Sequence, residues 1–379
     1  MYDIAVIGAG PAGSTLARLI GGRQRVLLVD VRELSADPPD RQDKCCGGLI
    51  APDAQKMLGR FGLGLPASVL VEPQLFVVRA VDLQTGLQRH YQRHYINVDR
   101  GRFDRWLVSL VPPPVDRRFG WRFRGAAEDG DGWKLRLRRG GEEIVERTRV
   151  LVGADGAGSS VRRLLAGPAP ATRTYIAVQE WYESPGVPPY FCAVFDTRVT
   201  DFYAWIVPKG DAVILGAALT PDRRAAGRFC ALKARLTEMG FAFGRRIAAE
   251  AAPLLRPTGP RSFHLGRGTV ALVGEAAGFI SPSSAEGISY AFRSAAAAGE
   301  ALAAGPEHLP RRYHAATCRL RLDLAAKVVK GGIMHNRLLR AAVMAAGIGS
   351  VRGVGRRVPL GAAVALSATV PGEFPGGEG

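Results

Sequence analysis

The hydrophobic positions near the N-terminus follow a different pattern from those in the rest of the chain. The apolar run YDIAVI (2–7) is followed by STLARLI (14–20), in which apolar residues recur at helical spacing, and then by RVLLVD (25–30). Short apolar runs of this kind are typical of strands that are buried on both faces of a parallel sheet. These residues predict a strand, a helix and a second strand at the start of an α/β domain.

The middle and the end of the chain have other patterns. QLFVVRAVDL (74–83), YFCAVFD (190–196) and DAVILGAAL (211–219) are rich in strand-forming residues, and turn signals such as PKGD (208–211) separate them. After residue 300 the pattern becomes helical and rich in Ala and Arg, and it ends in PGEFPGGEG, which predicts a frayed tail. We therefore expect a β-rich region followed by a helical segment.

The composition is that of a globular protein with a sizeable core. The chain has 379 residues, 47% of them hydrophobic, so two or three domains are expected. Apolar runs such as AAVMAAGIG (341–349) are shorter than the roughly 18 residues that a membrane span needs. The first residues, MYDIAVIGAG, lack the basic segment and cleavage site of a signal peptide. A cytoplasmic protein without a membrane-spanning helix is the expectation.

The charge and the cysteines indicate neither nucleic-acid binding nor a metal site. The net charge is +17, but the excess is almost all Arg scattered along the chain. The five Cys have neither disulfide nor metal-ligand spacing, and the six His are scattered. One basic segment resembles a surface-seeking sequence and predicts peripheral contact with the inner face of the membrane. Its residues are Arg337, Arg340, Arg352, Arg356 and Arg357.

A glycine-rich turn, GAGPAG (8–13), directly follows the first apolar run. The first Gly permits a tight turn, the second lets the backbone approach a pyrophosphate, and the third allows close packing of helix on strand. Asp30 ends the next run, where its carboxylate can accept both hydroxyls of an adenosine ribose. A dinucleotide site is therefore predicted at Asp30 and at Gly8, Gly10, Pro11, Ala12 and Gly13. NAD and FAD both remain open on this evidence.

Two later segments, VLVGADGAGSSVRR (150–163) and GEAAGFISPSSAEG (274–287), resemble the FAD proteins of the p-hydroxybenzoate hydroxylase fold. The resemblance implies that the first segment lies by the pyrophosphate of FAD and is linked to NAD(P)H use. It places the second segment at the ribityl chain, before a helix whose N-terminus faces the isoalloxazine ring. Glu replaces the Asp that is usual in the second segment, which keeps the charge and adds a methylene. The residues so implicated are Asp155, Gly156, Gly274, Glu275, Gly278, Gly287 and Ile288.

The same resemblance implies the fold class and the domain boundaries. The class is α/β, with a Rossmann-like FAD-binding domain, an inserted antiparallel β-sheet substrate domain and a C-terminal helical segment. RGRFD (100–104) also resembles the superfamily pattern R-x-x-F-D, so Arg100 is expected near the flavin or its phosphates. The discontinuous FAD-binding domain is expected at 1–70, 98–170 and 260–300, the substrate domain at 71–97 and 171–259, and the helical segment at 301–379.

The segment KCCGGLIAPDAQ (44–55) resembles the CGG loop of the geranylgeranyl reductase family, flavoproteins that reduce isolated double bonds of isoprenoid chains. Other segments, such as YIAVQEWYE (175–183), are similar to one bacterial branch of that family, the colicin M resistance flavoproteins. The resemblance implies that Cys46 lies near the flavin face, with Gly47 and Gly48 allowing the backbone to approach the ring. A small buried hydrophobe is the alternative for this thiol. Cys45 stands where the branch usually has Pro.

The segment DFYAWIVPKGD (201–211) resembles the Y-x-W-x-F-P motif of the geranylgeranyl reductases. Alternation along a strand places Tyr203, Trp205 and Val207 on one face, which would form the wall of an apolar tunnel above the flavin. An ordinary sheet core would show the same pattern. The segment is also similar to the W-x-W-x-I-P motif of flavin halogenases, although no Lys lies in 57–97, where halogenases typically carry theirs.

These resemblances imply an FAD-dependent oxidoreductase that reduces double bonds of a prenyl or lipid-like substrate. Reduced flavin would supply a hydride, and Cys46, Tyr203 or a water would supply the proton, with Trp205 beside them. NAD(P)H that docks transiently, or a ferredoxin-type acidic protein, would supply electrons. The alternatives are a flavin monooxygenase or halogenase of the same fold, and a non-enzymatic flavin protein that binds a lipid carrier.

Overall fold

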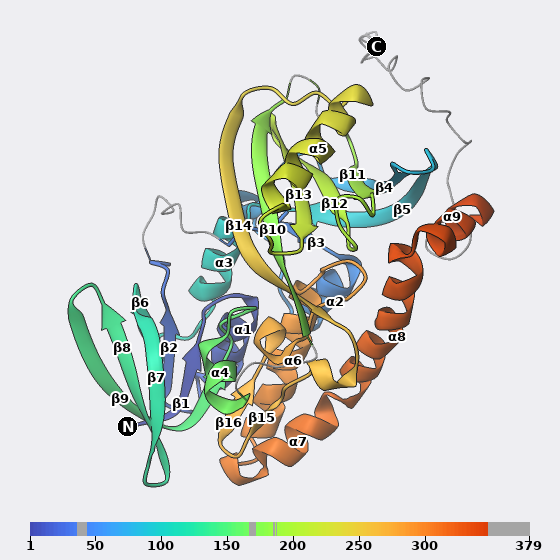
Figure 1. Cartoon of the computed structure of the whole chain (residues 1–379). Helices are drawn as coiled ribbons and strands as arrows, with labels where there is room; N and C mark the ends of the chain where they lie inside the picture. Colours follow the sequence, from blue (N-terminus) through green and yellow to red (C-terminus); the bar gives the residue numbers. More distant parts are fainter. Residues whose placement is uncertain (36–43, 167–171, 185, 187, 348–379) are drawn as a thin grey trace, which may run out of the picture.

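The computed structural model describes residues 1–35, 44–166, 172–184, 186 and 188–347, and these residues form two eight-stranded sheets with flanking helices (Figure 1). One sheet contains the N-terminal strand. The strands of the second sheet come from residues 49–97 and 172–257. This arrangement agrees with the α/β class expected from the sequence. The predicted frayed tail (371–379) lies outside the described residues.

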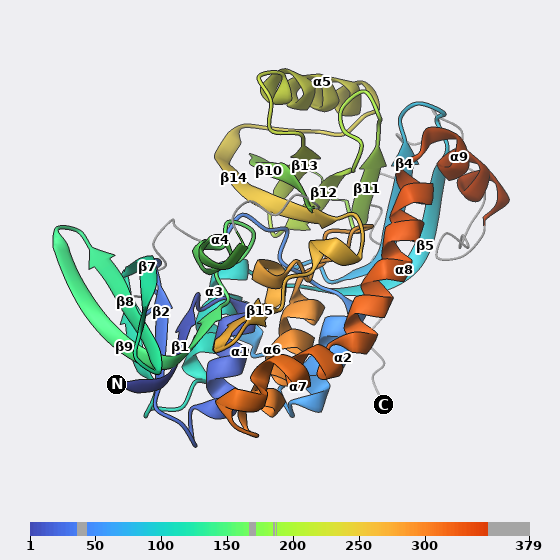
Figure 2. The ribbon, with the colours of Figure 1, turned by 60° about the horizontal axis from the view of Figure 1, so that its bottom comes forward.

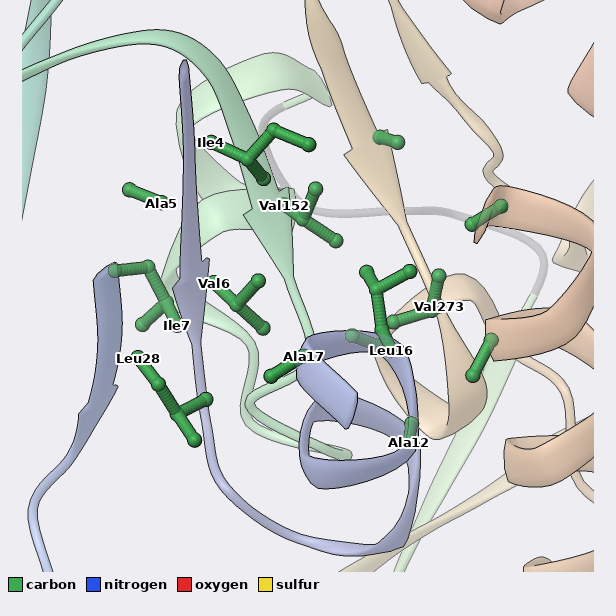
Figure 3. Close-up of a cluster of buried hydrophobic side chains, with 14 of the residues drawn as sticks. Ile4, Ala5, Val6, Ile7, Ala12, Leu16, Ala17, Leu28, Val152 and Val273 are labelled. Carbon is green, nitrogen blue, oxygen red and sulfur yellow. The ribbon is translucent and has the colours of Figure 1, made fainter. Parts of the chain in front are cut away.

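The first sheet is built on the predicted strand, helix and strand. β1 (Tyr2–Ile7) pairs in parallel with β2 (Val26–Asp30) and with β9 (Glu142–Gly153), and α1 (Pro11–Ile20) packs against them. Figure 3 shows the apolar side chains of these elements, such as Val6 and Leu16, in one cluster. The other strands are β6 (Asp116–Phe119), β7 (Arg122–Asp129), β8 (Gly132–Arg139), β15 (Gly266–Arg267) and β16 (Val270–Leu272).

The second sheet is antiparallel except where β4 and β11 run in parallel. One face packs on α5 (Ala225–Glu238), and the other carries an aromatic cluster. In spatial order the strands are β14 (Arg246–Pro257), β10 (Thr172–Glu183), β13 (Ala212–Leu219), β12 (Ala204–Lys209), β11 (Phe191–Phe195), β4 (Leu75–Asp82), β5 (Gln88–Asn97) and β3 (Leu49–Ile50).

The remaining helices flank the two sheets. Figures 1 and 2 both show α8 along one side of the molecule, from α7 near the first sheet to α9 beside β4 and β5. Among the residues that the structure describes, no helix has the length and hydropathy of a membrane span. The helices are α2 (Pro52–Arg60), α3 (Arg100–Ser109), α4 (Ser160–Ala166), α6 (Ile288–Leu302), α7 (Leu309–Ala316), α8 (Cys318–His335) and α9 (Arg337–Ala346).

Candidate functional site

The glycine-rich turn after β1 is packed so closely that two of its positions exclude a side chain. Gly8 has a φ of 105°, and a Cβ there would lie 2.5 Å from the Ala154 carbonyl oxygen. A Cβ at Gly13 would lie 1.8 Å from the Gly8 carbonyl oxygen, whereas one at Gly10 would meet nothing within 4 Å. Two glycines therefore pack the turn, and Gly10 leaves open space in front of it.

Segments far apart in the sequence meet at this turn. A Cβ at Gly274 would lie 3.0 Å from the Cβ of Ala12, so the first and third predicted segments are in direct contact. Arg162, from the second segment, donates a hydrogen bond to the Ala276 carbonyl oxygen at 3.2 Å. The fold thus brings together the three motifs that the sequence singled out.

Two helices begin here without a side-chain cap. α1 follows Gly10 and α6 follows Gly287, and neither helix has a capping side chain or an acidic residue in its first turn. The backbone N–H groups and partial positive charge of both N-termini are therefore offered to an anion or an electron-rich group. With the open space at Gly10, this arrangement fits FAD, and the expected positions of its pyrophosphate near Pro11 and of its ring near Ile288 stay predictions.

Asp30 is already engaged by protein groups. Its carboxylate accepts hydrogen bonds from the Ala9 backbone N–H at 2.7 Å and from the backbone N–H of Arg32 at 2.8 Å. The Arg32 guanidinium adds two more bonds, each 3.1 Å long. Asp30 therefore holds the glycine turn, and a ribose hydroxyl would have to replace part of the Arg32 contact. The predicted contact with the ribose stays a prediction.

Acidic Glu275 and Asp155 also have partners within the chain. The Glu275 carboxylate accepts the Leu255 backbone N–H at 3.1 Å and pairs with Lys44 Nζ at 2.9 Å. Asp155 accepts hydrogen bonds from the Ser159 hydroxyl and the Ser160 backbone N–H, so it caps the start of α4. Glu275 thereby ties the CGG loop to the third segment. Positive φ angles support the backbone bends at Gly156, Gly274 and Gly278.

A buried chain of alternating charges leads from Asp30 to the CGG loop. Arg32 also pairs with Asp104 at 2.8 Å, and Arg100 Nε pairs with the other oxygen of that carboxylate at 2.8 Å. Burial alone would raise the pKa of Asp104, but the Arg100 and Arg32 guanidinium groups hold it below the usual value. Arg100, predicted near the flavin or its phosphates, has Asp104 and the Cys46 thiol as its partners in the structure.

The pKa values of the two adjacent cysteines are shifted in opposite directions. Burial raises the pKa of Cys45 to about 12. Burial also opposes ionisation of Cys46, but the Arg100 guanidinium and a hydrogen bond from the Gly48 backbone N–H bring the pKa of Cys46 below its usual value. Cys46 therefore loses its proton more readily than an ordinary cysteine, and the choice among Cys46, Tyr203 and a water as proton donor stays a prediction.

Removing the Arg100 guanidinium is expected to raise the pKa of Cys46. In Arg100→Met, alkylation of Cys46 by iodoacetamide, followed by mass spectrometry, should require a higher pH than in the wild type, because the positive charge that favours the thiolate is gone. Arg100→Lys keeps the positive charge and should restore most of the profile. Arg102→Met, on the exposed side of α3, is the matched control. An unchanged profile in Arg100→Met would contradict the assignment.

Lys209 is a functional candidate that the sequence reasoning missed. Its Nζ donates to Asn97 Oδ1 at 2.6 Å, to the Val98 carbonyl oxygen at 2.7 Å and to the Gly48 carbonyl oxygen at 3.3 Å. Burial lowers the pKa of Lys209 to about 7. It anchors the CGG loop to the second sheet. The alternation of Tyr203, Trp205 and Val207 reaches Lys209 in one further step, and this was the available signal.

Tyr203, Trp205 and Val207 lie in one apolar cluster, as their alternation predicts. The Tyr203 hydroxyl donates to the Ser284 carbonyl oxygen at 2.7 Å, and Trp205 Nε1 donates to Gln179 Oε1 at 3.1 Å. Burial raises the pKa of Tyr203 well above its usual value, so the phenol stays protonated. Gly47 faces the same strand, because a Cβ there would lie 3.4 Å from Val207 Cγ2. Whether these side chains line a substrate tunnel stays a prediction.

A second missed group lies beside the N-terminus of α6. Glu286 accepts two hydrogen bonds from Arg93 Nη2, at 2.8 and 3.0 Å, and one from the Tyr95 hydroxyl at 2.6 Å. Arg93 and Tyr95 alternate along β5, but the sequence gives no sign that this strand reaches Glu286. The ion pair fixes the loop that leads into Gly287 and carries Ser284, the partner of Tyr203. In the described part of the chain, no cluster of three or more His, Cys, Asp or Glu could hold a metal.

The comparisons with known proteins show the family and the fold of the chain. No protein-family model matches the chain. Protein CbrA of Shigella dysenteriae serotype 1 is 40% identical over 350 residues, which cover 92% of this chain and 98% of that protein. Twenty-five curated proteins, including CbrA from several Escherichia coli strains, match.

Solved structures share the fold at low sequence identity. A geranylgeranyl bacteriochlorophyll reductase-like protein from Thermoplasma acidophilum has a TM-score of 0.76 and 18% identity, and the match covers 89% of this chain and 87% of that one. PqsL from Pseudomonas aeruginosa, a probable FAD-dependent monooxygenase, has a TM-score of 0.67 and 20% identity, and the match covers 91% of this chain and 99% of that one. The myxobacterial halogenase CndH has a TM-score of 0.66 and 21% identity, and the match covers 89% of this chain and 84% of that one. The predicted p-hydroxybenzoate hydroxylase-type flavoprotein fold is thus confirmed.

Proposed function

The chain belongs to the CbrA family, and from this premise we propose that it is an FAD-dependent oxidoreductase that reduces carbon–carbon double bonds of a prenyl or lipid-like substrate. The flavoprotein fold accommodates reduction, oxygenation and halogenation. The choice among these reactions therefore depends on the site and not on the fold.

One observation carries the proposal: the CGG loop lies against the strand that bears Tyr203 and Trp205. Lys209 Nζ holds the Gly48 carbonyl oxygen, and Gly47 faces Val207. The two motifs that resemble geranylgeranyl reductases are about 155 residues apart in the sequence, yet they are in contact. The side chains of that strand beside the loop, Tyr203, Trp205 and Val207, are apolar and aromatic, which suits a hydrocarbon chain.

The residues of the chain have separable roles in this proposal. FAD, when bound, supplies the hydride-transfer chemistry. Arg100 stabilises negative charge on Cys46, and the aromatic wall excludes water from the reacting carbon atoms. Tyr203, kept protonated by burial, holds a proton within the site, although its hydroxyl must leave the Ser284 carbonyl oxygen to donate it elsewhere. NAD(P)H or a ferredoxin-type protein would supply the electrons.

A flavin monooxygenase or halogenase is the second candidate, and the resemblance to PqsL and CndH favours it. Lys209 does place a lysine near the CGG loop, but its ammonium group already has three protein acceptors. Whether the group is charged or neutral, its N–H bonds are therefore satisfied without a substrate. This observation weighs against a Lys209 that acts directly on a substrate.

An anaerobic reaction separates these candidates. Purified protein loaded with FAD is reduced and then mixed with a polyprenyl compound in a stopped-flow spectrometer. The mass of the product is measured by mass spectrometry. We expect the flavin absorbance to return without oxygen and the product to gain two hydrogen atoms. Reoxidation only by oxygen, with an oxygenated or halogenated product, would overturn the reductase proposal. Binding of the lipid without turnover, whatever the electron donor, would favour the non-enzymatic carrier protein.

A further inference from the structure

Helices α8 and α9 expose a row of large apolar side chains. Leu322, Val329 and Ile333 are spaced so that they share one side of α8, and Leu338 and Leu339 continue the row on α9. Leu338 is 77% exposed, Val329 67% and Leu322 65%. These two helices carry five of the twelve large apolar side chains that the described residues expose. We refer to these five residues as the α8–α9 face.

Helix α9 buries an arginine and exposes two leucines, unlike an ordinary surface helix. Its Arg340 points inward and pairs with Asp82 at 2.9 Å, with both side chains almost fully buried. This corrects the sequence-based view of Arg340 as part of an exposed basic segment. Arg89 Nε donates to the Met344 carbonyl oxygen at 2.6 Å and fixes the other end of the helix. Polar contacts on the inner side thus hold α9 with its leucines in the solvent.

The rest of α9's outer side is apolar as well. Ala342, Ala345 and Ala346 are exposed next to Leu338 and Leu339. Leucines exposed to water forgo the free energy of burial unless another apolar phase covers them. An exposed apolar patch of this kind marks an interaction surface.

The charge around the α8–α9 face is strongly positive. Residues 309–346 contain eight Lys and Arg but one acidic residue, Asp323. Asp323 accepts a hydrogen bond from Tyr290 and pairs with Lys327, so it points toward α6 and not toward the face. Exposed basic residues border the apolar row and extend onto α7. They are Arg311, Arg312, Arg319, Lys330 and Arg337.

We propose that the α8–α9 face docks on an anionic phospholipid surface. An apolar row with a basic border is the pattern by which helices lie in the interfacial plane of a bilayer. A bilayer presents uniform negative charge over an apolar interior, and it needs no residue-by-residue match to this face. The occupant is therefore a lipid surface, and docking leaves the protein peripheral to the membrane.

The inner side of the same helices contacts the candidate substrate region. Met334, Val343 and Met344 pack on the cluster that contains Tyr203 and Trp205. His335 stacks on the Tyr203 ring, with centroids 6.4 Å apart. Docking would therefore place the substrate side of the proposed reductase next to the source of an apolar substrate. This link rests on the proposed function, whereas the docking itself does not.

Vesicle sedimentation of the full chain tests the proposal. FAD-loaded protein is mixed with vesicles of phosphatidylcholine containing phosphatidylglycerol, and with vesicles of phosphatidylcholine alone. We expect sedimentation with the anionic vesicles, and a loss of affinity of at least about tenfold in Leu338→Glu/Leu339→Glu. Val145→Glu, which places the same charge at an exposed apolar position on β9, should bind like the wild type. Unchanged flavin spectra and melting temperatures confirm that the variants are folded.

Several results would overturn the proposal. They are the absence of sedimentation by the wild type, equal binding by the double Glu variant, and loss of binding only when residues 348–379 are removed. A dimer that the double Glu variant dissociates, without vesicle binding, would assign the face to a second copy of the chain. Reduction of a detergent-solubilised prenyl compound should be unchanged in the double Glu variant. If reduction fails in every protein but vesicle binding persists, the proposed function fails and the docking stands.

Discussion

Replacing Gly10 by alanine is expected to leave the flavin-free fold intact and to weaken FAD binding by about 100-fold, whereas Gly13→Ala destabilises the fold itself. A Cβ at Gly10 meets no protein atom within 4 Å, so it would occupy only the open space that is predicted to hold the pyrophosphate. A Cβ at Gly13 would overlap the Gly8 carbonyl oxygen at 1.8 Å. Overpacking of this kind costs about 1–3 kcal/mol, and about 2.7 kcal/mol corresponds to 100-fold in affinity.

Two measurements separate the Gly10 and Gly13 effects. FAD affinity is measured by quenching of flavin fluorescence, and the stability of the flavin-free protein by urea unfolding. Gly22→Ala lies at the other end of α1, where a Cβ also meets nothing, and should change neither quantity much. Normal FAD affinity in Gly10→Ala would show that the pyrophosphate does not lie at this turn. A fully stable Gly13→Ala protein would contradict the packing described for it.

The folded protein is expected to lose stability as the pH falls below about 6.5, because His335 is buried in its neutral form. Burial, with Arg256 and Arg340 nearby, lowers the pKa of His335 to about 3, and its Nδ1 lies 2.9 Å from the Phe202 carbonyl oxygen. His335 binds a proton near pH 6.5 in the unfolded chain but only near pH 3 in the folded chain. The free energy of unfolding therefore rises with pH within this window.

A variant isolates this residue from the other groups that titrate in acid. Between pH 6.5 and 5 the contribution of His335 amounts to about 2 kcal/mol, since each pH unit corresponds to about 1.4 kcal/mol. In His335→Asn, whose amide can still donate to the Phe202 carbonyl oxygen, urea unfolding should show a pH dependence smaller by that amount. His308→Asn removes an exposed histidine and should leave the dependence unchanged. Equal slopes in the wild type and His335→Asn would contradict the assignment.

The local patterns of the sequence were sufficient to predict the dinucleotide-binding strand, helix and strand, whereas the FAD-binding fold followed from the resemblance to known flavoproteins. The glycine turn, the apolar strands around it and the alternation of Tyr203, Trp205 and Val207 depend on neighbouring residues, which one sequence displays directly. The contact between Ala12 and Gly274 was expected only through the resemblance to a known fold.

The pairs that complete the site could not be predicted in this way. Lys209 and Asn97 are 112 residues apart, and Arg93 and Glu286 are 193 apart. Nothing in the local sequence distinguishes such a lysine or arginine from one in solvent, because its partner is set by strand order and register. For the same reason the sequence indicated an exposed Arg340, although its partner Asp82 lies 258 residues earlier.

The parallel pairing of β1, β9 and β16 has a consequence for the order of events during synthesis. β9 ends at Gly153, and β16 and the start of α6 come only after residue 269. A nascent chain can form the glycine turn early, but its flavin site stays incomplete until residues 270–288 have left the ribosome. High contact order of this kind delays folding. The cofactor should therefore be captured late, so flavin bound to ribosome-attached chains of increasing length would rise only after that segment emerges.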